Sequence, residues 1–69
     1  MAAKFAVGQK VRHKATCTLY IVLTGPATCR YEPDDTPCYR YVFAGDFEQP
    51  GRTEWIRPQQ MMESKFESA

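Results

Sequence analysis

Residues Thr16–Thr24 read TCTLYIVLT and carry the strongest strand signal in the chain. The stretch is rich in β-branched residues, which favour extended structure, and Gly25-Pro26 directly after it marks a turn. Alternate positions give two apolar faces, one formed by Leu19, Ile21 and Leu23 and the other by Tyr20 and Val22. We therefore expect a strand that is buried on both faces.

A second clear strand is predicted at Cys38–Phe43. Its residues alternate between two faces, with Tyr39, Tyr41 and Phe43 on one and Cys38, Arg40 and Val42 on the other. Shorter strands are predicted at Gln9–Lys14, Ala27–Tyr31 and Glu54–Arg57, separated by a tight turn over Glu32–Pro37 and a polar loop over Ala44–Thr53. Short strands between regular turn signals are typical of an all-β barrel or sandwich.

The C-terminal segment, residues 58–69, changes character. Pro58 suits the first turn of a helix, and Met62 and Phe66 are four residues apart. We expect one or two helical turns that pack Met62 against the barrel mouth. The two ends of the chain, residues 1–4 and 65–69, are expected to fray.

The size and composition place limits on the class of protein. With 69 residues, the chain is expected to form one domain, residues 1–69. A net charge of +1 argues against a polycation that binds nucleic acid by charge alone. No apolar run is long enough to cross a membrane, and Met1–Lys10 lacks the apolar region of a secretory signal. We therefore expect a cytoplasmic protein without membrane partners.

The three cysteines, Cys17, Cys29 and Cys38, are expected to be free thiols in a reducing compartment. His13 is the only histidine, and the sequence has no C-x-x-C pair, so neither a metal nor another cofactor is predicted. A catalytic pair of His13 with a cysteine is disfavoured, because the cysteines lie in predicted strands and are expected to be buried. Asp34-Asp35 is more typical of a turn than of an acid–base pair.

The two ends of the chain resemble small SH3-like domains. Phe5-Ala-Val-Gly-Gln-Lys-Val11 is similar to their first strand, and Trp55-Ile-Arg-Pro-Gln-Gln-Met-Met62 to their last strand and the helical turn after it. The resemblance covers short bacterial proteins of the YodC type and the plasmid-borne type II dihydrofolate reductases. It implies a five-stranded SH3-like barrel with a short C-terminal helical turn, and such small proteins are often carried by mobile genetic elements.

The reductase activity is not implied. That family places a Gln-Ile-Tyr triplet before the proline of its last strand, where this chain has Trp55, Ile56 and Arg57. The family's active-site lysine falls at His13 or, with a slip of one residue, at Lys14. Because the substrate-holding residues are not matched, we expect no catalytic residues and a non-enzymatic protein.

The aromatic residues indicate a binding surface. A core of this size cannot hold all of the central aromatic side chains, which are Tyr20, Tyr31, Tyr39, Tyr41, Phe43, Phe47 and Trp55. Exposed aromatics in SH3-like and Tudor-like domains line grooves for proline-rich peptides or cages for methylated Lys or Arg. The predicted patch for a protein or peptide partner consists of Tyr39, Tyr41 and Trp55, with Tyr20 beside them and Arg40 or Arg57 as its polar rim.

Two other functions remain open from the sequence. Lys10, Arg12 and Lys14 share one face of the first strand and could contact nucleic acid, although acidic loop residues offset them. Alternatively, aromatic strands on an undersized barrel could be buried in a homo-oligomer, which could bind a small ligand at its interface.

Overall fold

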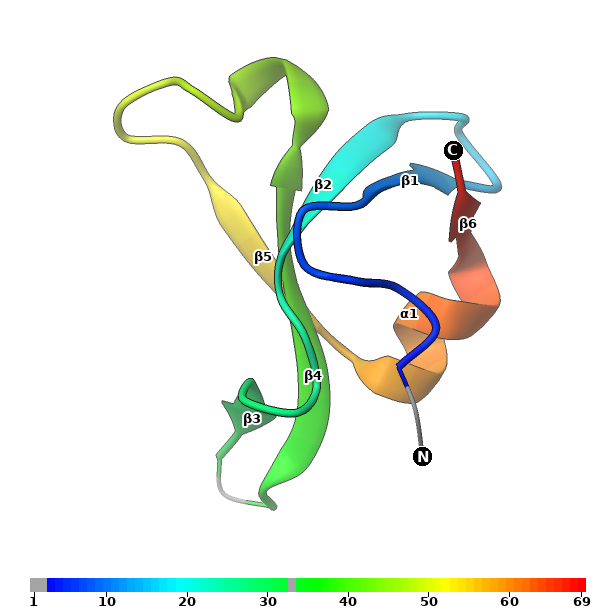
Figure 1. Ribbon diagram of the computed structural model, residues 1–69, viewed down its shortest axis with the longest axis vertical. Helices are drawn as coiled ribbons and strands as arrows, with labels where there is room; N and C mark the ends of the chain where they lie inside the picture. The colour runs from blue at the N-terminus through cyan, green and yellow to red at the C-terminus, as the bar shows by residue number, and fades with distance from the viewer. Residues whose placement is uncertain (1–2, 33) are drawn as a thin grey trace.

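The two strongest strand signals form the two longest strands, β2 (Leu19–Thr24) and β4 (Thr36–Phe43), in a computed structural model that describes residues 3–32 and 34–69 (Figure 1). The fold is mostly β-sheet, with one short helix in the described residues. The other elements are β1 (Lys10–His13), β3 (Arg30–Tyr31), the 3-10 turn η1 (Ala44–Asp46), β5 (Glu54–Pro58), α1 (Gln59–Lys65) and β6 (Phe66–Ser68).

The strands form one antiparallel sheet in the order β6–β1–β2–β4–β5, and β3 pairs with the start of β4. Val22 lies opposite Tyr41, and Tyr41 lies opposite Trp55, which fixes the register of β2, β4 and β5. Among the described residues, β5 does not pair with β6. The structure is therefore an open six-stranded sheet, where a closed five-stranded barrel was expected.

β2 begins three residues later than predicted, because residues 14–16 form a turn and Cys17 and Thr18 follow it outside the strand. Cys17 has a positive φ of 62°, and its N–H donates to the His13 carbonyl at 2.7 Å. The Thr16 hydroxyl accepts from the backbone N–H of Thr18 at 3.3 Å. Such local side-chain bonds compete with strand pairing. Cys17 is consequently exposed, and the expectation that all three cysteines are buried is wrong for it.

The segment between β2 and β4 is less extended than predicted. Thr28 and Cys29 both donate backbone hydrogen bonds to the Gly25 carbonyl, so the turn after β2 continues to residue 29 and β3 keeps only two residues. The predicted turn over Glu32–Pro37 ends sooner, because β4 already begins at Thr36. Pro33 lies outside the described residues.

The C-terminal segment forms a strand, which corrects the expectation that residues 65–69 fray. Phe66 lies opposite His13 and Ser68 lies opposite Val11, so β6 extends the sheet beyond β1. The Phe66 side chain is fully buried and anchors this strand in the core. At the other end, the Lys4 N–H donates to Glu63 at 2.9 Å, and residues 1–2 lie outside the described part of the chain.

The main core lies on one face of the sheet. It is closed by the N-terminal segment, by α1 and by β6, which lie together on the same side of the molecule (Figure 1). Met62 is fully buried there, which confirms that the helical turn packs Met62 against the sheet. The core consists of Phe5, Val11, Val22, Tyr39, Tyr41, Met62 and Phe66, with Tyr20 packed at its margin.

Candidate partner-binding surface

Two residues of the predicted patch belong to the core. Tyr39 is fully buried and Tyr41 is 3% exposed, so neither side chain is open to a partner. The alternation predicted for β4 is correct, since both rings lie in the core cluster. Their face is covered by Phe5, α1 and β6, which are distant in sequence and which the strand pattern alone does not place there.

Trp55 is 41% exposed and rests on the buried Tyr41 ring. The two rings are stacked, with centroids 5.9 Å apart and planes inclined by 27°. The pair follows from the register of β4 with β5, which places Trp55 directly opposite Tyr41. Tyr41 therefore supports an exposed Trp55.

Three aromatic rings from neighbouring strands form the exposed part of this surface. Tyr20 of β2 contacts Trp55 edge to face, with centroids 5.8 Å apart, and contacts Phe43 of β4 at 6.1 Å. Phe43 is 38% exposed and Tyr20 is partly buried. We call Tyr20, Phe43 and Trp55 the aromatic ledge.

Phe43 was missing from the predicted patch, although it shares a face of β4 with Tyr39 and Tyr41. It is the last residue of β4, beyond the part of that face that α1 and the N-terminal segment cover. A side chain on Gly45 would come within 2.7 Å of the Phe43 ring. The Gly-containing turn directly after Phe43 is the sequence signal that could have indicated a ring lying against η1.

The ring geometry argues against a cage for a methylated cation. Tyr20 meets Trp55 at an interplanar angle of 89° and Phe43 at 73°, and both pairs are in edge-to-face contact. A cation bound by these rings would need open space over their faces, between the rings. Because each pair is in edge-to-face contact, the three rings pack against one another and do not stand apart as the walls of a cage.

Arg57 contacts two core rings that lie next to the ledge, those of Tyr41 and Phe66. Its Nε donates to the Tyr41 hydroxyl at 2.9 Å, and its guanidinium lies 5.7 Å from the centroid of Phe66. Arg40 lies on the other face of β4, where its guanidinium pairs with Glu54 at 3.8 Å. Of the two arginines predicted as a rim, only Arg57 contacts the aromatic cluster.

A polar cluster lies at the α1 end of the core. The Tyr39 hydroxyl donates to Glu63 Oε2 at 2.5 Å, and Gln59 Nε2 donates to the same oxygen at 3.1 Å. An open cavity of about 720 Å³ lies beside them, lined among others by Lys4, Pro37 and Pro58. The Tyr39 bond joins α1 to β4, and the bond from the Lys4 N–H to the same oxygen joins α1 to the N-terminal segment, so the cluster is structural.

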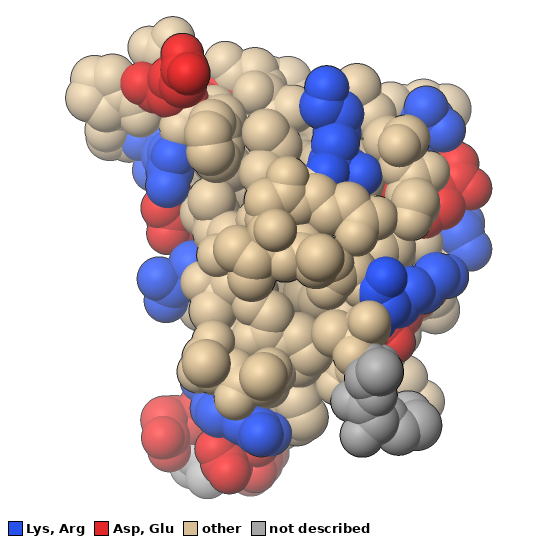
Figure 2. Space-filling view, viewed as in Figure 1, with Lys and Arg blue, Asp and Glu red and all other residues tan. Residues whose placement is uncertain are grey.

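The basic residues in and directly after β1 are partly engaged within the chain. Arg12 pairs with Glu67 of β6 at 3.2 Å, and Lys14 Nζ donates to the Ser64 carbonyl at 3.1 Å. Lys10 is exposed. On the face drawn in Figure 2, blue and red groups are scattered around an uncharged centre and do not gather into one basic area. Nucleic-acid binding through Lys10, Arg12 and Lys14 stays a prediction.

His13 and the cysteines do not come together as a site. The His13 ring packs edge to face on Phe66, with centroids 4.8 Å apart. Cys29 and Cys38 are buried free thiols, and burial, followed by the nearby Cys29, raises the pKa of Cys38 above its usual value of 9.0. Within residues 3–32 and 34–69, no group of three His, Cys, Asp or Glu side chains is placed to hold a metal ion.

Comparison with known proteins adds no relative: no family model matches the chain, and no curated protein or solved structure is significantly similar to it. The resemblance to YodC-type proteins and type II reductases therefore stays a prediction. No helix in the described part of the chain has both the length and the apolar character needed to span a membrane.

Proposed function

We propose that this chain is a non-enzymatic, SH3-like interaction module that binds a protein or peptide through the aromatic ledge. The observation that supports this proposal is that Trp55 and Phe43, on neighbouring strands, remain 41% and 38% exposed while both contact Tyr20. Contiguous exposed apolar surface of this kind is typical of interaction sites. Tyr41 beneath Trp55 supports the ledge and reduces the ordering cost of binding.

The SH3-like assignment is supported by strand order. β1, β2, β4 and β5 follow one another as an antiparallel meander, and β6 returns after the helical turn to pair with β1. This order agrees with the sequence resemblance at the two ends of the chain. The assignment concerns topology, since β5 and β6 are not paired among the described residues.

A ligand for this surface should present apolar side chains to the exposed parts of these rings. Proline and aliphatic side chains fit such a surface, because they pack on aromatic faces without requiring a deep pocket. Arg57 stands beside the rings and offers a donor to a peptide carbonyl or carboxylate. We therefore propose an extended peptide segment with proline or aliphatic residues as the ligand.

Selection from a displayed random-peptide library tests the proposal. Peptides enriched on the wild-type protein should bind Trp55→Ala and Phe43→Ser at least about tenfold more weakly, since each change removes apolar contact area. Tyr31→Ala is the matched control, because Tyr31 is 57% exposed on β3 and makes no contact with the ledge rings. Its affinity should equal that of the wild type.

Thermal unfolding followed by circular dichroism establishes that the variants are folded. If folded Trp55→Ala and Phe43→Ser bind the selected peptides as tightly as the wild type, the ledge is not the binding surface. Enrichment of no peptide, together with salt-sensitive binding of a labelled single-stranded oligonucleotide, would favour the basic strand instead.

A further inference from the structure

The β5 strand has one free edge. It pairs with β4 on one side and, among the described residues, with no strand on the other. Pro58 lies opposite Cys38 and has no N–H, so these two residues cannot exchange hydrogen bonds. Since bonded and non-bonded pairs alternate in an antiparallel ladder, Trp55 and Arg57 bond to β4. Glu54 and Ile56 therefore direct their N–H and C=O groups outward.

Both faces of this edge strand carry exposed apolar side chains. Trp55 is 41% exposed on the core face, and Ile56 is 43% exposed on the opposite face. No turn or loop of the described chain supplies a backbone hydrogen bond to Glu54 or Ile56. An edge with unpaired backbone groups and apolar side chains favours the addition of another strand.

We propose that β5 pairs with β5 of a second copy of this chain, antiparallel, about a two-fold axis at Trp55. In this register Glu54 of each copy lies opposite Ile56 of the other, as a hydrogen-bonded pair. The outward N–H and C=O groups of Glu54 and Ile56 then all find partners. An axis at Ile56 would place Glu54 opposite Pro58, which has no N–H to donate. Pro58 is also the N-cap residue of α1, and the carbonyl of an N-cap residue accepts the first hydrogen bond of its helix.

The side chains agree with the same register. The two Trp55 residues face each other as a non-hydrogen-bonded pair, the type in which side chains are closest. Arg57 is diagonal to Trp55 of the second copy and within reach of its ring.

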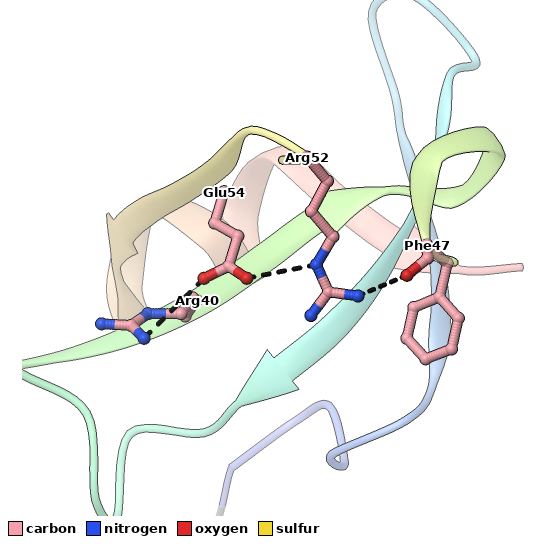
Figure 3. A network of polar contacts seen from close by, with 4 residues as sticks. All are labelled: Arg40, Phe47, Arg52 and Glu54. Carbon is pink, nitrogen blue, oxygen red and sulfur yellow. Dashed lines mark hydrogen bonds and ion pairs between the residues drawn. The ribbon is translucent and has the colours of Figure 1, made fainter. Parts of the chain in front are cut away.

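Charges also fit a symmetric contact. Glu54 lies between Arg40 and Arg52, whose guanidinium groups are 3.8 Å and 3.2 Å from its carboxylate (Figure 3). Arg52 is itself held by a hydrogen bond to the Phe47 carbonyl. The two Glu54 carboxylates lie diagonally across the axis, and each is paired with Arg40 and Arg52 of its own copy. No two like charges stand directly opposite each other in the pairing.

The dimer goes beyond peptide binding and does not depend on it. Tyr20 and Phe43 lie on β2 and β4 and take no part in the backbone pairing. The two ledges would lie side by side across the axis, joined at the paired Trp55 side chains.

Sedimentation of the full chain over a range of concentrations tests the dimer. Ile56→Pro removes the outward N–H and the isoleucine side chain but no hydrogen bond to β4, and the dimer dissociation constant should rise at least about tenfold. Ile56→Val keeps the N–H and the branched side chain and should dimerise like the wild type. Fluorescence of Trp55, the only tryptophan, should shift to the blue as the wild type dimerises.

Cross-linking tests the register. In a Cys17→Ser background, Trp55→Cys should form a disulfide-linked dimer with diamide as oxidant, because only residue 55 lies opposite its own copy. Ile56→Cys and Arg57→Cys should cross-link far less. A wild type that sediments as a monomer at the highest concentration overturns the proposal, and equal cross-linking at all three positions overturns the register.

The two proposals fail in different ways. Loss of peptide binding in Phe43→Ser with unchanged sedimentation supports the ledge alone. Loss of the dimer in folded Ile56→Pro with unchanged peptide binding supports the edge alone.

Discussion

Glu63 joins three separate parts of the chain through one carboxylate. Its Oε2 accepts hydrogen bonds from the Tyr39 hydroxyl, the Lys4 N–H and the Gln59 amide. Burial by itself would raise the pKa of Glu63, but these hydrogen bonds outweigh it and hold the pKa below its usual value of 4.5. Burial and the bond to Glu63 raise the pKa of Tyr39 above 10.0.

These shifts predict a pH dependence of stability. A carboxyl whose folded-state pKa is lowered stabilises the fold above its unfolded-state pKa and loses that contribution as the pH falls. Glu63→Gln should therefore destabilise the protein by about 1 kcal/mol at neutral pH, and the difference should shrink below pH 4.5. Urea unfolding of the wild type and of Glu63→Gln, at neutral pH and again below pH 4.5, measures this difference.

Glu67→Gln is the control, since Glu67 forms a half-exposed pair with Arg12 that contributes little. A Glu63→Gln effect of the same size at both pH values would contradict a role for the ionised carboxylate.

For the single residues of β4, the alternation between two faces was predictable from the sequence, but the exposure of each side chain was not. Tyr39, Tyr41 and Phe43 share one face, yet the first two are buried and the third is 38% exposed. Alternation fixes only the face of the sheet to which each side chain points. Exposure depends on what covers the face, and here the covering residues, Phe5 and Phe66, lie far along the chain.

Among the elements, β6 departs most from expectation. A polar C-terminal segment of a few residues is normally expected to fray. Phe66 reverses this, because its ring is fully buried and contacts Tyr20 and Tyr41 at centroid distances of 5.6 Å and 5.4 Å. The spacing of Met62 and Phe66 predicts one helical face, but the helix ends at Lys65 and Phe66 begins a strand.

Phe66→Ala should consequently cost about 3–5 kcal/mol of unfolding free energy, a large part of the stability of a small domain. Urea unfolding midpoints measure the loss. Phe47→Ala is the matched control, with a ring that is 38% exposed and lies beside Arg52, and it should cost about 1 kcal/mol or less. Comparable losses in the two variants would mean that β6 does not hold the core together.

For the molecule as a whole, the three thiols report on how often the fold opens. Cys17 is exposed in a turn, whereas Cys29 and Cys38 are buried. A thiol reagent should therefore modify Cys17 at once and the other two only after opening, with Cys38 further slowed because burial raises its pKa. Mass spectrometry over time should give one fast and two slow additions, and three fast additions would contradict the packing.

The pairing of β6 with β1 also affects when the chain can fold during its synthesis. Arg12 lies opposite Glu67 in the ladder, so β1 gains this partner only after residues more than fifty positions later have been made. Contacts of such long sequence separation slow folding, because a long loop must close before they form. On the ribosome, β1 and the core residue Phe5 therefore stay incompletely covered until Phe66–Ser68 have left the exit tunnel.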